Sequence, residues 1–549
     1  MSSRLPDHLD LIADAPSGMQ KLRGLILELA VRGKLVPQDP KDEPASELLQ
    51  RIAKERARLE AEGTCKKSKS MPDTDSDAKP FDVPAGWQWV RLAEIGHDWG
   101  QKTPDADFTY VDVSAIDNAK GAIKSPSVLA PADAPSRARK IVCLGTVIYS
   151  TIRPYLLNIA VIDRELMPTP IASTAFAVIH PLAELSSQYI FWYLRSPVFI
   201  RYVEAVQMGI AYPAINDSQF FSGFFPLAPL AEQHRIVAKV DELMALCDRL
   251  EAEQTDATSA HAKLVETLLG TLTQSRNAFE LAANWQRLSQ HFDTLFSTES
   301  SLDSLKQTVL QLAVMGKLVP QDPKDEPANE LLKRIAARKS RLAVEGSYKG
   351  GTTVTAISSD DAPAATPMNW CWVPFGEVMI SRDNERIPVS KDERNTRAKI
   401  YDYYGASGVI DKIDSYLFDS ALLLIGEDGA NLINRSTPIA FIARGQYWVN
   451  NHAHVLDGIS EEFLRFIELY INATDLKPYV TGTAQPKMNQ AKMNSIPIAL
   501  PPEAEQHRIV AKVDELMALC DLLKADLAES RTRQARLSTT LIDAALKAA

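Results

Sequence analysis

The chain has 549 residues, of which 45% are hydrophobic and 24% are charged, and its formal net charge at pH 7 is −10. This length exceeds what one hydrophobic core usually organises, and the composition excludes a disordered chain, so we expect about two to four domains. The negative charge disfavours a phosphate-binding surface spread over the whole molecule but leaves open a local one, or one completed by a partner.

No stretch of the sequence has the pattern of a membrane span or an export signal. A spanning helix needs about 18 or more consecutive apolar residues, whereas apolar runs such as Ala421–Ile425 are far shorter. The first residues, MSSRLPDHLD, lack the apolar core of a signal peptide. The five cysteines form neither a CxxC pair nor the even set of a secreted disulfide framework. We therefore expect a cytoplasmic protein with reduced thiols and no membrane partner.

Two helices and a linker are predicted in the N-terminal region, residues 1–80. Apolar residues recur at helical spacing across Ser17–Arg32, and Gly33 marks the end of that helix. A second amphipathic helix begins after Pro44, which suits a first-turn position. Thr64–Lys79 is rich in Ser, Thr, Asp and Lys, a composition that predicts a flexible linker.

The same text returns further along the chain. GKLVPQDPKDEPA occurs at Gly33–Ala45 and again at Gly316–Ala328, an offset of 283 residues, with predicted helices on both sides of each copy. A second polar linker, residues 347–366, follows. Tryptophan pairs come after the two linkers at the same offset, in Pro84–Val90 and Pro367–Val373. The repeats predict a duplicated organisation.

Two segments between these repeats share almost no further text, roughly residues 91–230 and 374–503. In each, short β-rich runs are separated by Gly, Pro and Asn turns and are followed by an amphipathic helix. Each segment is long enough to form an independent mixed domain. We place the two domains at residues 81–230 and 367–503.

An identical helical stretch follows each variable domain, because Glu232–Asp248 recurs letter for letter as Glu505–Asp521 at an offset of 273. Apolar residues continue by threes and fours beyond both copies. This is coiled-coil spacing, and about 40 residues at ~1.5 Å each predict a rod roughly 60 Å long. We assign residues 231–346 to a central helical spacer and residues 504–549 to a C-terminal helix.

The polar positions of this repeated helix are identical as well, although a coiled-coil seam alone would preserve only the apolar ones. We therefore expect exposed surfaces that dock the same partner twice. A recent duplication without a docking role is the alternative. The predicted docking residues are Glu232, Gln233, His234, Arg235 and Lys239 in the first copy and Glu505, Gln506, His507, Arg508 and Lys512 in the second.

The combination of LAVxGKLVPQDPKDEPAxELL, the tryptophan pairs and PLAEQHRIVAKVDELMALCD resembles the specificity subunit of Type I restriction-modification systems. The resemblance covers nearly the whole chain and its duplicated order. It implies a fold of class α+β, in which two α/β target-recognition domains are joined and separated by long antiparallel coiled-coil-like helices, with a pseudo-two-fold internal repeat.

The resemblance also implies a role and partners. Each target-recognition domain would read one half of a bipartite site in double-stranded DNA, and the helices would recruit two methyltransferase subunits, through which motor-nuclease subunits join. The chain itself would hold no cofactor, because S-adenosylmethionine, ATP and magnesium would be bound by those partners.

Candidate DNA contacts come from loops of the two variable domains. Gly426–Ser436, Val449–Val455 and Thr481–Gln490 resemble the family's recognition loops, and Tyr149–Val161 and Val206–Phe220 correspond to them more weakly. Asn, Gln, Arg and Lys read adenine and guanine edges, whereas Thr, Ser and Lys suit phosphates. The candidates are Ser150, Thr151, Arg153, Tyr155, Asn158 and Tyr212 in the first domain and Asn431, Arg435, Asn451, His452, Thr483, Gln485 and Lys487 in the second.

Other signals argue against catalysis by this chain. His452 and His454 lack the third spaced ligand of a metal site, and acidic residues in a glycine turn, such as Glu427 and Asp428, are usually solvated or capping. The sequence contains neither a GxxxxGK[ST] phosphate loop nor the Asn-Pro-Pro-aromatic tetrapeptide of amino-methyltransferases. The alternative to a DNA reader is a two-headed protein-binding scaffold, which the acidic charge favours; a self-sufficient enzyme would need the missing motifs.

Overall fold

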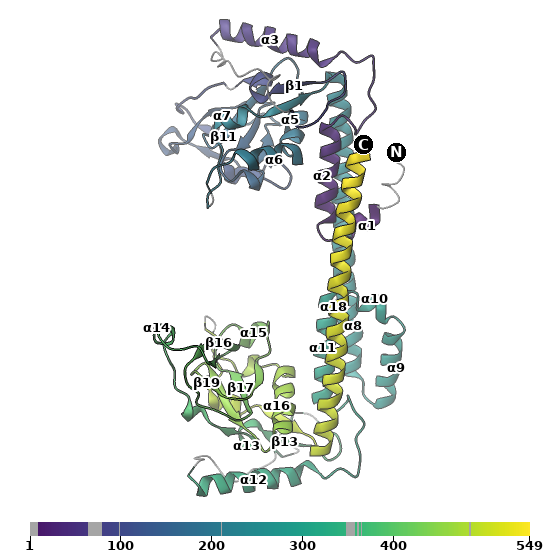
Figure 1. Cartoon of the computed structure of the whole chain (residues 1–549), viewed down its shortest axis with the longest axis vertical. Helices are drawn as coiled ribbons and strands as arrows, with labels where there is room; N and C mark the ends of the chain where they lie inside the picture. Colours follow the sequence, from purple (N-terminus) through teal and green to yellow (C-terminus); the bar gives the residue numbers. More distant parts are fainter. Residues whose placement is uncertain are drawn as a thin grey trace. The chain divides into compact units, whose positions relative to one another are not determined.

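The computed structural model describes residues 9–63, 79–97, 99–209, 211–346, 357–358, 362–363, 365–482 and 485–548. It divides into two compact units (Figure 1). Unit 1 comprises Met1–Asp256 and Ser530–Ala549, and unit 2 comprises Ala257–Glu529. Two long helices, α8 (Leu230–Gln274) and α18 (Glu503–Ala548), each contribute one part to either unit. The two predicted linkers lie mostly outside the described residues. This applies to residues 64–78 of the first linker and to most of the second, residues 347–366.

Unit 1 begins with helices that pack on its parts of α8 and α18. Leu22 of α2 is buried with Ile236 of α8. The Lys21 ammonium donates to the Ala535 carbonyl (3.2 Å) and Arg23 pairs with Asp248 (2.7 Å). The helices of unit 1 besides the two long ones are α1 (Leu9–Ala13), α2 (Gly18–Val31), α3 (Ala45–Ala61), α4 (Leu92–Ile95), α5 (Ser187–Leu194), α6 (Pro197–Val206) and α7 (Asp217–Phe221).

The strand-rich domain of unit 1 contains two four-stranded sheets, ordered β6-β3-β10-β7 and β2-β11-β8-β9, and the pairs β1-β12 and β4-β5. Strand β10 pairs parallel with β3 and antiparallel with β7. The strands are β1 (Gln88–Arg91), β2 (Gly96–His97), β3 (Phe108–Val111), β4 (Ile116–Asp117), β5 (Ala122–Ile123), β6 (Ser127–Leu129), β7 (Ala138–Ile141), β8 (Val147–Ser150), β9 (Ile159–Val161), β10 (Pro170–Ser173), β11 (Phe176–Pro181) and β12 (Phe224–Leu227).

Unit 2 carries a second strand-rich domain, with sheets ordered β14-β20-β17-β18 and β16-β15-β19 and the pair β13-β21. The strands are β13 (Cys371–Pro374), β14 (Ile380–Ser381), β15 (Tyr401–Gly405), β16 (Gly408–Ile413), β17 (Leu422–Gly426), β18 (Ala440–Ala443), β19 (Tyr447–Val449), β20 (Ala453–Asp457) and β21 (Pro497–Leu500).

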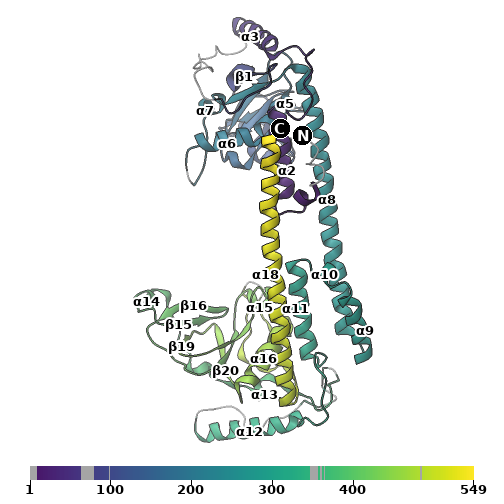
Figure 2. The same ribbon diagram turned by 45° about the vertical axis from the view of Figure 1, so that its right-hand side comes forward.

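One amphipathic helix, α16, joins the sheet of unit 2 to its helices. The Ser460 hydroxyl caps its first turn by accepting from the Phe463 amide (3.1 Å). Its buried face packs on β17, β18 and α11, and it lies beside α11 in both views (Figures 1 and 2). The helices of unit 2 are α9 (Ala278–Ser289), α10 (Phe292–Leu295), α11 (Glu299–Val314), α12 (Ala328–Val344), α13 (Phe375–Val378), α14 (Lys391–Asn395), α15 (Asn431–Asn434), α16 (Glu461–Ala473) and α17 (Gln490–Asn494).

A glycine ends the corresponding helices α2 and α11 in the same way. Gly33 and Gly316 both have φ of 67°, which favours glycine. A Cβ at either position would lie 2.5 Å from the ring of a proline, Pro84 or Pro367, in the segment that carries the tryptophans. The repeated glycines therefore allow the chain to turn and the tryptophan segment to pack closely.

The fold is mixed α/β, as the sequence predicts. Among the described residues, the structure contains no helix that is both long enough and apolar enough to cross a bilayer.

Candidate nucleic-acid interface

Three loops of unit 2 meet beyond the end of β17. The Glu427 amide donates to the His452 carbonyl (2.8 Å), and the Glu427 carbonyl accepts from the Met488 amide (2.8 Å). The Gly429 amide donates to the Pro486 carbonyl (2.9 Å). The loops are those that the sequence indicates. We call residues 427–437, 450–452, 481–482 and 485–488 loop junction 2; Thr483, a predicted contact, lies outside the described residues.

Charged side chains at the base of loop junction 2 form ion pairs with one another. His454 is buried, with Nδ1 2.6 Å from the Asp383 carboxylate and Nε2 3.0 Å from the Met488 carbonyl oxygen. Arg386 pairs with Asp383 (3.4 Å) and with Glu427 (2.9 Å). Burial acts to lower the pKa of His454, but the bond and charge of Asp383, together with Met488 and Glu427, outweigh it and the pKa is raised. This network holds β20 against two of the three loops.

Four predicted contacts of unit 2 lie exposed at the junction. Lys487 is about half exposed and its ammonium lies 3.2 Å from the Glu427 carboxylate. The exposed His452 ring places Nδ1 2.7 Å from the Asp428 carboxylate. Asn451 and Gln485 are also exposed. The junction therefore presents donors and acceptors, with two carboxylates among them.

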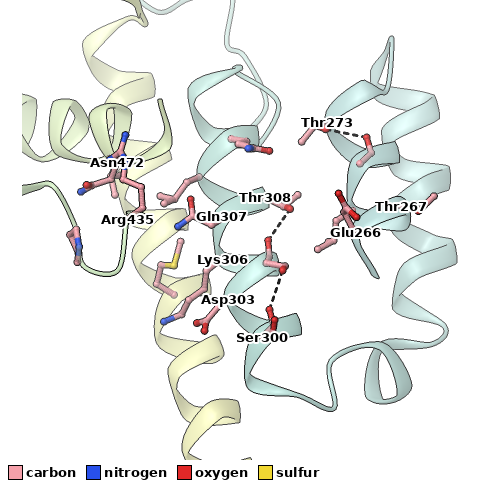
Figure 3. Close-up of a pocket in the computed structure, with 18 of the residues that line it drawn as sticks. Glu266, Thr267, Thr273, Ser300, Asp303, Lys306, Gln307, Thr308, Arg435 and Asn472 are labelled. Atoms are coloured by element: carbon pink, nitrogen blue, oxygen red, sulfur yellow. Dashed lines mark hydrogen bonds between the residues drawn. The ribbon is translucent and has the colours of Figure 1, made fainter. Parts of the chain in front are cut away.

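Asn431 and Arg435 belong to the same junction but are only partly exposed. Asn431 closes its own loop, since its amide nitrogen donates to the Thr437 carbonyl (3.1 Å) and its amide oxygen accepts from Ser436 (3.0 Å). Arg435 donates to the Thr474 carbonyl (2.5 Å). It lines a groove of about 1230 Å³ between the loop and the helices of unit 2, where Asn472 lies near it and Lys306 and Gln307 project from α11 (Figure 3).

The junction does not resemble a metal centre. His452 and His454 bind different carboxylates, those of Asp428 and Asp383. Across the part of the chain that the structure describes, no cluster of His, Cys, Asp or Glu could hold a metal ion.

Unit 1 builds a loop junction with the same hydrogen bonds. The Thr151 amide donates to the Ala175 carbonyl (2.8 Å), and the Thr151 carbonyl accepts from the Ile215 amide (2.9 Å). The Arg153 amide donates to the Pro213 carbonyl (2.8 Å). These bonds correspond one by one to those of Glu427 and Gly429. We call residues 151–158, 174–175, 207–209 and 211–216 loop junction 1.

The last loop of each junction also closes identically. Met208 and Ala214 exchange two backbone hydrogen bonds (both 2.9 Å), as do Thr481 and Lys487 (both 2.8 Å). Gly209 and Gly482 have φ of 88° and 84°. This equivalence was not predicted from the sequence, although a Gly-x-Ala-x-Pro pattern begins at both glycines with the offset of the repeated helix, 273.

The predicted contacts of unit 1 divide into buried and exposed groups. Ser150, Thr151 and Asn158 are buried, against the expectation that their side chains face a ligand. The Ser150 hydroxyl donates to the Ile152 carbonyl (2.9 Å) and that of Thr151 to the Ala175 carbonyl (2.9 Å), because polar groups at a buried strand end need partners. These side chains shape the loop.

The other three candidates of unit 1, Arg153, Tyr155 and Tyr212, are exposed. The Arg153 guanidinium lies 5.1 Å from the centroid of the Tyr212 ring, within cation–π range. Loop junction 1 therefore brings one cation and two aromatic rings to the surface.

The expectation that the polar residues of the repeated helix are all exposed is wrong for four of them. Glu232, Gln233, Glu505 and Gln506 are at most 2% exposed. The Glu232 carboxylate accepts from the Trp87 indole (2.8 Å) and from Gln38. The two carboxylates bind the segments that precede the domains, whereas the Gln233 amide donates to the Ala228 carbonyl (2.8 Å), just before its own helix. The identity of these residues between the copies therefore reflects internal contacts.

Glu505 occupies the same environment, where it accepts from the Trp370 indole (2.9 Å) and from Gln321 (3.3 Å). Burial raises the pKa of Glu232 and of Glu505 above its ordinary value, although the hydrogen bonds from the tryptophan and glutamine act to lower it. Gln506 donates to the Pro501 carbonyl (2.9 Å).

The remaining predicted docking residues reach the surface to different degrees. His234 and His507 are exposed. Arg235 and Arg508 are partly exposed and form two-pronged ion pairs with Asp42 (2.6 Å) and Asp325 (2.5 Å). Lys239 and Lys512, also partly exposed, pair with glutamates on their own helices, at 2.9 Å in both cases.

Comparison with known proteins identifies similar chains. A family model described as the Type I restriction modification DNA specificity domain matches residues 367–529. The chain is 37% identical to the Type I restriction enzyme EcoEI specificity subunit of Escherichia coli, over 96% of this chain and 94% of that protein. It is 35% identical, with the same coverage, to the EcoAI specificity subunit of Escherichia coli. One chain in a solved structure of a type I R-M system has a similar fold, with a TM-score of 0.53 and 23% identity over 85% of this chain and 99% of that one.

Proposed function

Because the chain belongs to the Type I restriction enzyme specificity subunits, we propose that its two strand-rich domains each read one half of a bipartite DNA sequence. Members of this family are the non-catalytic, DNA-recognising subunits of these enzymes. We infer that loop junction 1 and loop junction 2 are the surfaces that contact the two half-sites.

The observation that carries this proposal is the repeated backbone of the two junctions. Equivalent hydrogen bonds hold Thr151 and Glu427, and equivalent pairs close the loops at Met208 and Thr481. The exposed side chains on these backbones differ, as they do between Tyr212 and Gln485. A constant backbone with variable side chains suits two domains that bind the same polymer but read different bases.

We further propose that the helices connect the two domains as a spacer. In this arrangement the long helices pack as an antiparallel coiled coil and the chain has pseudo-two-fold internal symmetry. A dimeric reader binds half-sites about 34 Å, one helical turn, apart, and the element that joins its heads fixes that spacing. The proposed domain boundaries are 81–230 and 367–503 for the recognition domains, with 231–346 and 504–549 for the helices between and after them.

The exposed residues of the repeated helix are the proposed docking surface for two methyltransferase subunits. The remaining candidates are His234 and Lys239 on the first copy and His507 and Lys512 on the second. The exposed parts of Arg235 and Arg508 complete the surface. The motor-nuclease subunits would join through the methyltransferases. S-adenosylmethionine, ATP and magnesium would belong to these partners, and the complex would act in the cytoplasm.

Selection from a randomised DNA library tests the proposal. The chain is purified with its methyltransferase subunit, and the bound duplexes are sequenced. We expect one motif with two specified parts separated by unspecified bases. Enrichment of a continuous motif, or of none, would reject it.

Salt dependence separates DNA binding from the protein-scaffold alternative. Binding that neutralises several phosphates loses roughly 10³ to 10⁵ in affinity between about 50 and 200 mM salt. An affinity for DNA that does not change over this range would favour the scaffold.

A further inference from the structure

The two junctions place their variable side chains at equivalent positions. Ile152 is bridged to Ala214, and Ala214 to Met208. Residues that face each other across an antiparallel bridge project to the same side, so these three side chains form one face. In unit 2 the same two bridges join Asp428, Lys487 and Thr481. Between the closing residues of this loop, Tyr212 of unit 1 corresponds to Gln485 of unit 2 at the offset of 273.

These equivalent faces differ in chemical character. In unit 1, Ile152 is 37%, Met208 60% and Tyr212 70% exposed, and Ala214 lies between them. In unit 2 every one of the four positions is polar or charged: Asp428, Thr481, Gln485 and Lys487. Exposed large apolar side chains gathered within one loop junction indicate a surface that is covered in the working protein.

Junction 1 carries further exposed apolar residues and one cation. Tyr155 is 56% and Leu156 38% exposed on the adjoining loop of junction 1. The Arg153 guanidinium lies over the Tyr212 ring. This composition suits base edges better than phosphates, because phosphate contacts need several donors or cations.

In the major groove, the 5-methyl group of thymine is the apolar feature of a base edge. We propose that loop junction 1 reads its half-site by apolar contact with thymine methyl groups, through Ile152, Met208 and Tyr212. Loop junction 2 reads its half-site by hydrogen bonds that Lys487 donates, Asp428 accepts, and Gln485 both donates and accepts. This inference rests on the proposed function, and it names the chemistry by which each junction discriminates bases.

Side chains of junction 2 match the polar edges. A glutamine forms a two-pronged bond with adenine, a lysine donates to guanine, and a carboxylate accepts from the amino group of cytosine. Lys487 is held by Glu427 in the free protein. When Lys487 turns to a base, Glu427 keeps the Arg386 ion pair (2.9 Å), so the exchange leaves no carboxylate without a cation.

Replacement of thymine by 2′-deoxyuridine tests the inference, since it removes the methyl group and keeps the hydrogen-bonding edge. The split site is first obtained with the unmodified complex of the full chain and its methyltransferase. A Gln485→Ala variant, which relaxes selection in the half-site of junction 2, assigns the halves. Uridine is then placed in one half-site at a time and the Kd is measured.

We expect each contacted thymine of the junction 1 half-site to weaken binding about fourfold when its methyl is removed, because burying one such group contributes about 0.8 kcal/mol. The half-site of junction 2 should tolerate uridine without loss. In an Ile152→Asn, Met208→Gln double variant the uridine effect at the first half-site should disappear, while selection at the second half-site stays intact and shows that the protein is folded.

Several results would overturn the inference. One is a junction 1 half-site that contains no thymine. Another is a Kd that does not change when uridine replaces thymine in that half-site, or that changes no more than it does for uridine in the other half-site. An intact uridine effect in the double variant would also overturn it. If that variant instead releases the methyltransferase and no uridine effect exists, the apolar face is a protein contact. The absence of any split site would reject the proposed function itself.

Discussion

The buried contact between Trp87 and Glu232 ties the start of the first recognition domain to the repeated helix. Trp87→Phe keeps an aromatic ring but removes the indole donor that lies 2.8 Å from the carboxylate. Glu232 is 1% exposed, so water cannot replace that donor without opening the structure. Hydrogen bonds to charged groups contribute about 1.5–3 kcal/mol. We expect the variant to lose this amount of local stability.

The loss should depend on pH. Burial already raises the pKa of Glu232 above its ordinary value of 4.5. A raised folded pKa gives stability that is present below the unfolded pKa and is lost as the pH rises through the folded one. Removing the indole raises the folded pKa further. Trp87→Phe should therefore cost more at about pH 8 than at about pH 4.

Amide hydrogen exchange of the full chain measures this effect locally. Peptides that cover the first turns of α8 should exchange roughly 10- to 150-fold faster in the variant. Trp370→Phe is the matched control, because its indole lies 2.9 Å from Glu505 and should affect only the first turns of α18. In a Glu232→Gln background the cost of Trp87→Phe should fall to that of a neutral bond, about 1 kcal/mol. Equal costs in both backgrounds would refute the reasoning.

Two further variants test the docking surface and the loops. Reversing the charges of Arg235 and Arg508 together should reduce the methyltransferase bound per chain, as seen by native mass spectrometry. Restoring the ion pairs with Asp42→Arg and Asp325→Arg separates lost docking from lost folding: recovery of docking would assign the arginines a purely internal role. Gly482→Ala should abolish selection at one half-site and preserve it at the other in library sequencing. The reason is that φ of Gly482 is 84° and the added Cβ would lie 2.6 Å from a backbone oxygen. Unchanged selection at both half-sites would contradict this.

The sequence predicts the location of the loops better than the role of single residues. The three segments around Gly426, His452 and Gln485 follow from motif resemblance, and the structure brings them together. A polar residue, however, is identical in the two copies whether it docks a partner or makes the same internal contact, and the sequence does not distinguish the two cases. Glu232 is buried in contact with Trp87, which is distant in the sequence. A single sequence does not show which distant residues come into contact.

The residues that shape the shared loop backbone recur in the sequence, but the variable residues around them obscure this recurrence. Gly209 and Gly482, Pro213 and Pro486, and Asn216 and Asn489 all recur at the offset of 273. The glycines supply positive φ, and the asparagines cap α7 and α17 by accepting amides at 2.8 and 2.9 Å. Residues that fix a turn can thus be aligned from sequence, whereas the direction of the exposed side chains requires the structure.

The most direct test of a two-domain reader is the methylation pattern of a genome exposed to this chain and its methyltransferase. We expect methylated adenines in one motif with two specified parts. A Gln485→Ala, Lys487→Ala variant should change the bases of one part and leave the other part and the spacer length unchanged. Methylation at a continuous motif, or a variant that alters both parts together, would contradict a reader built from two independent recognition domains.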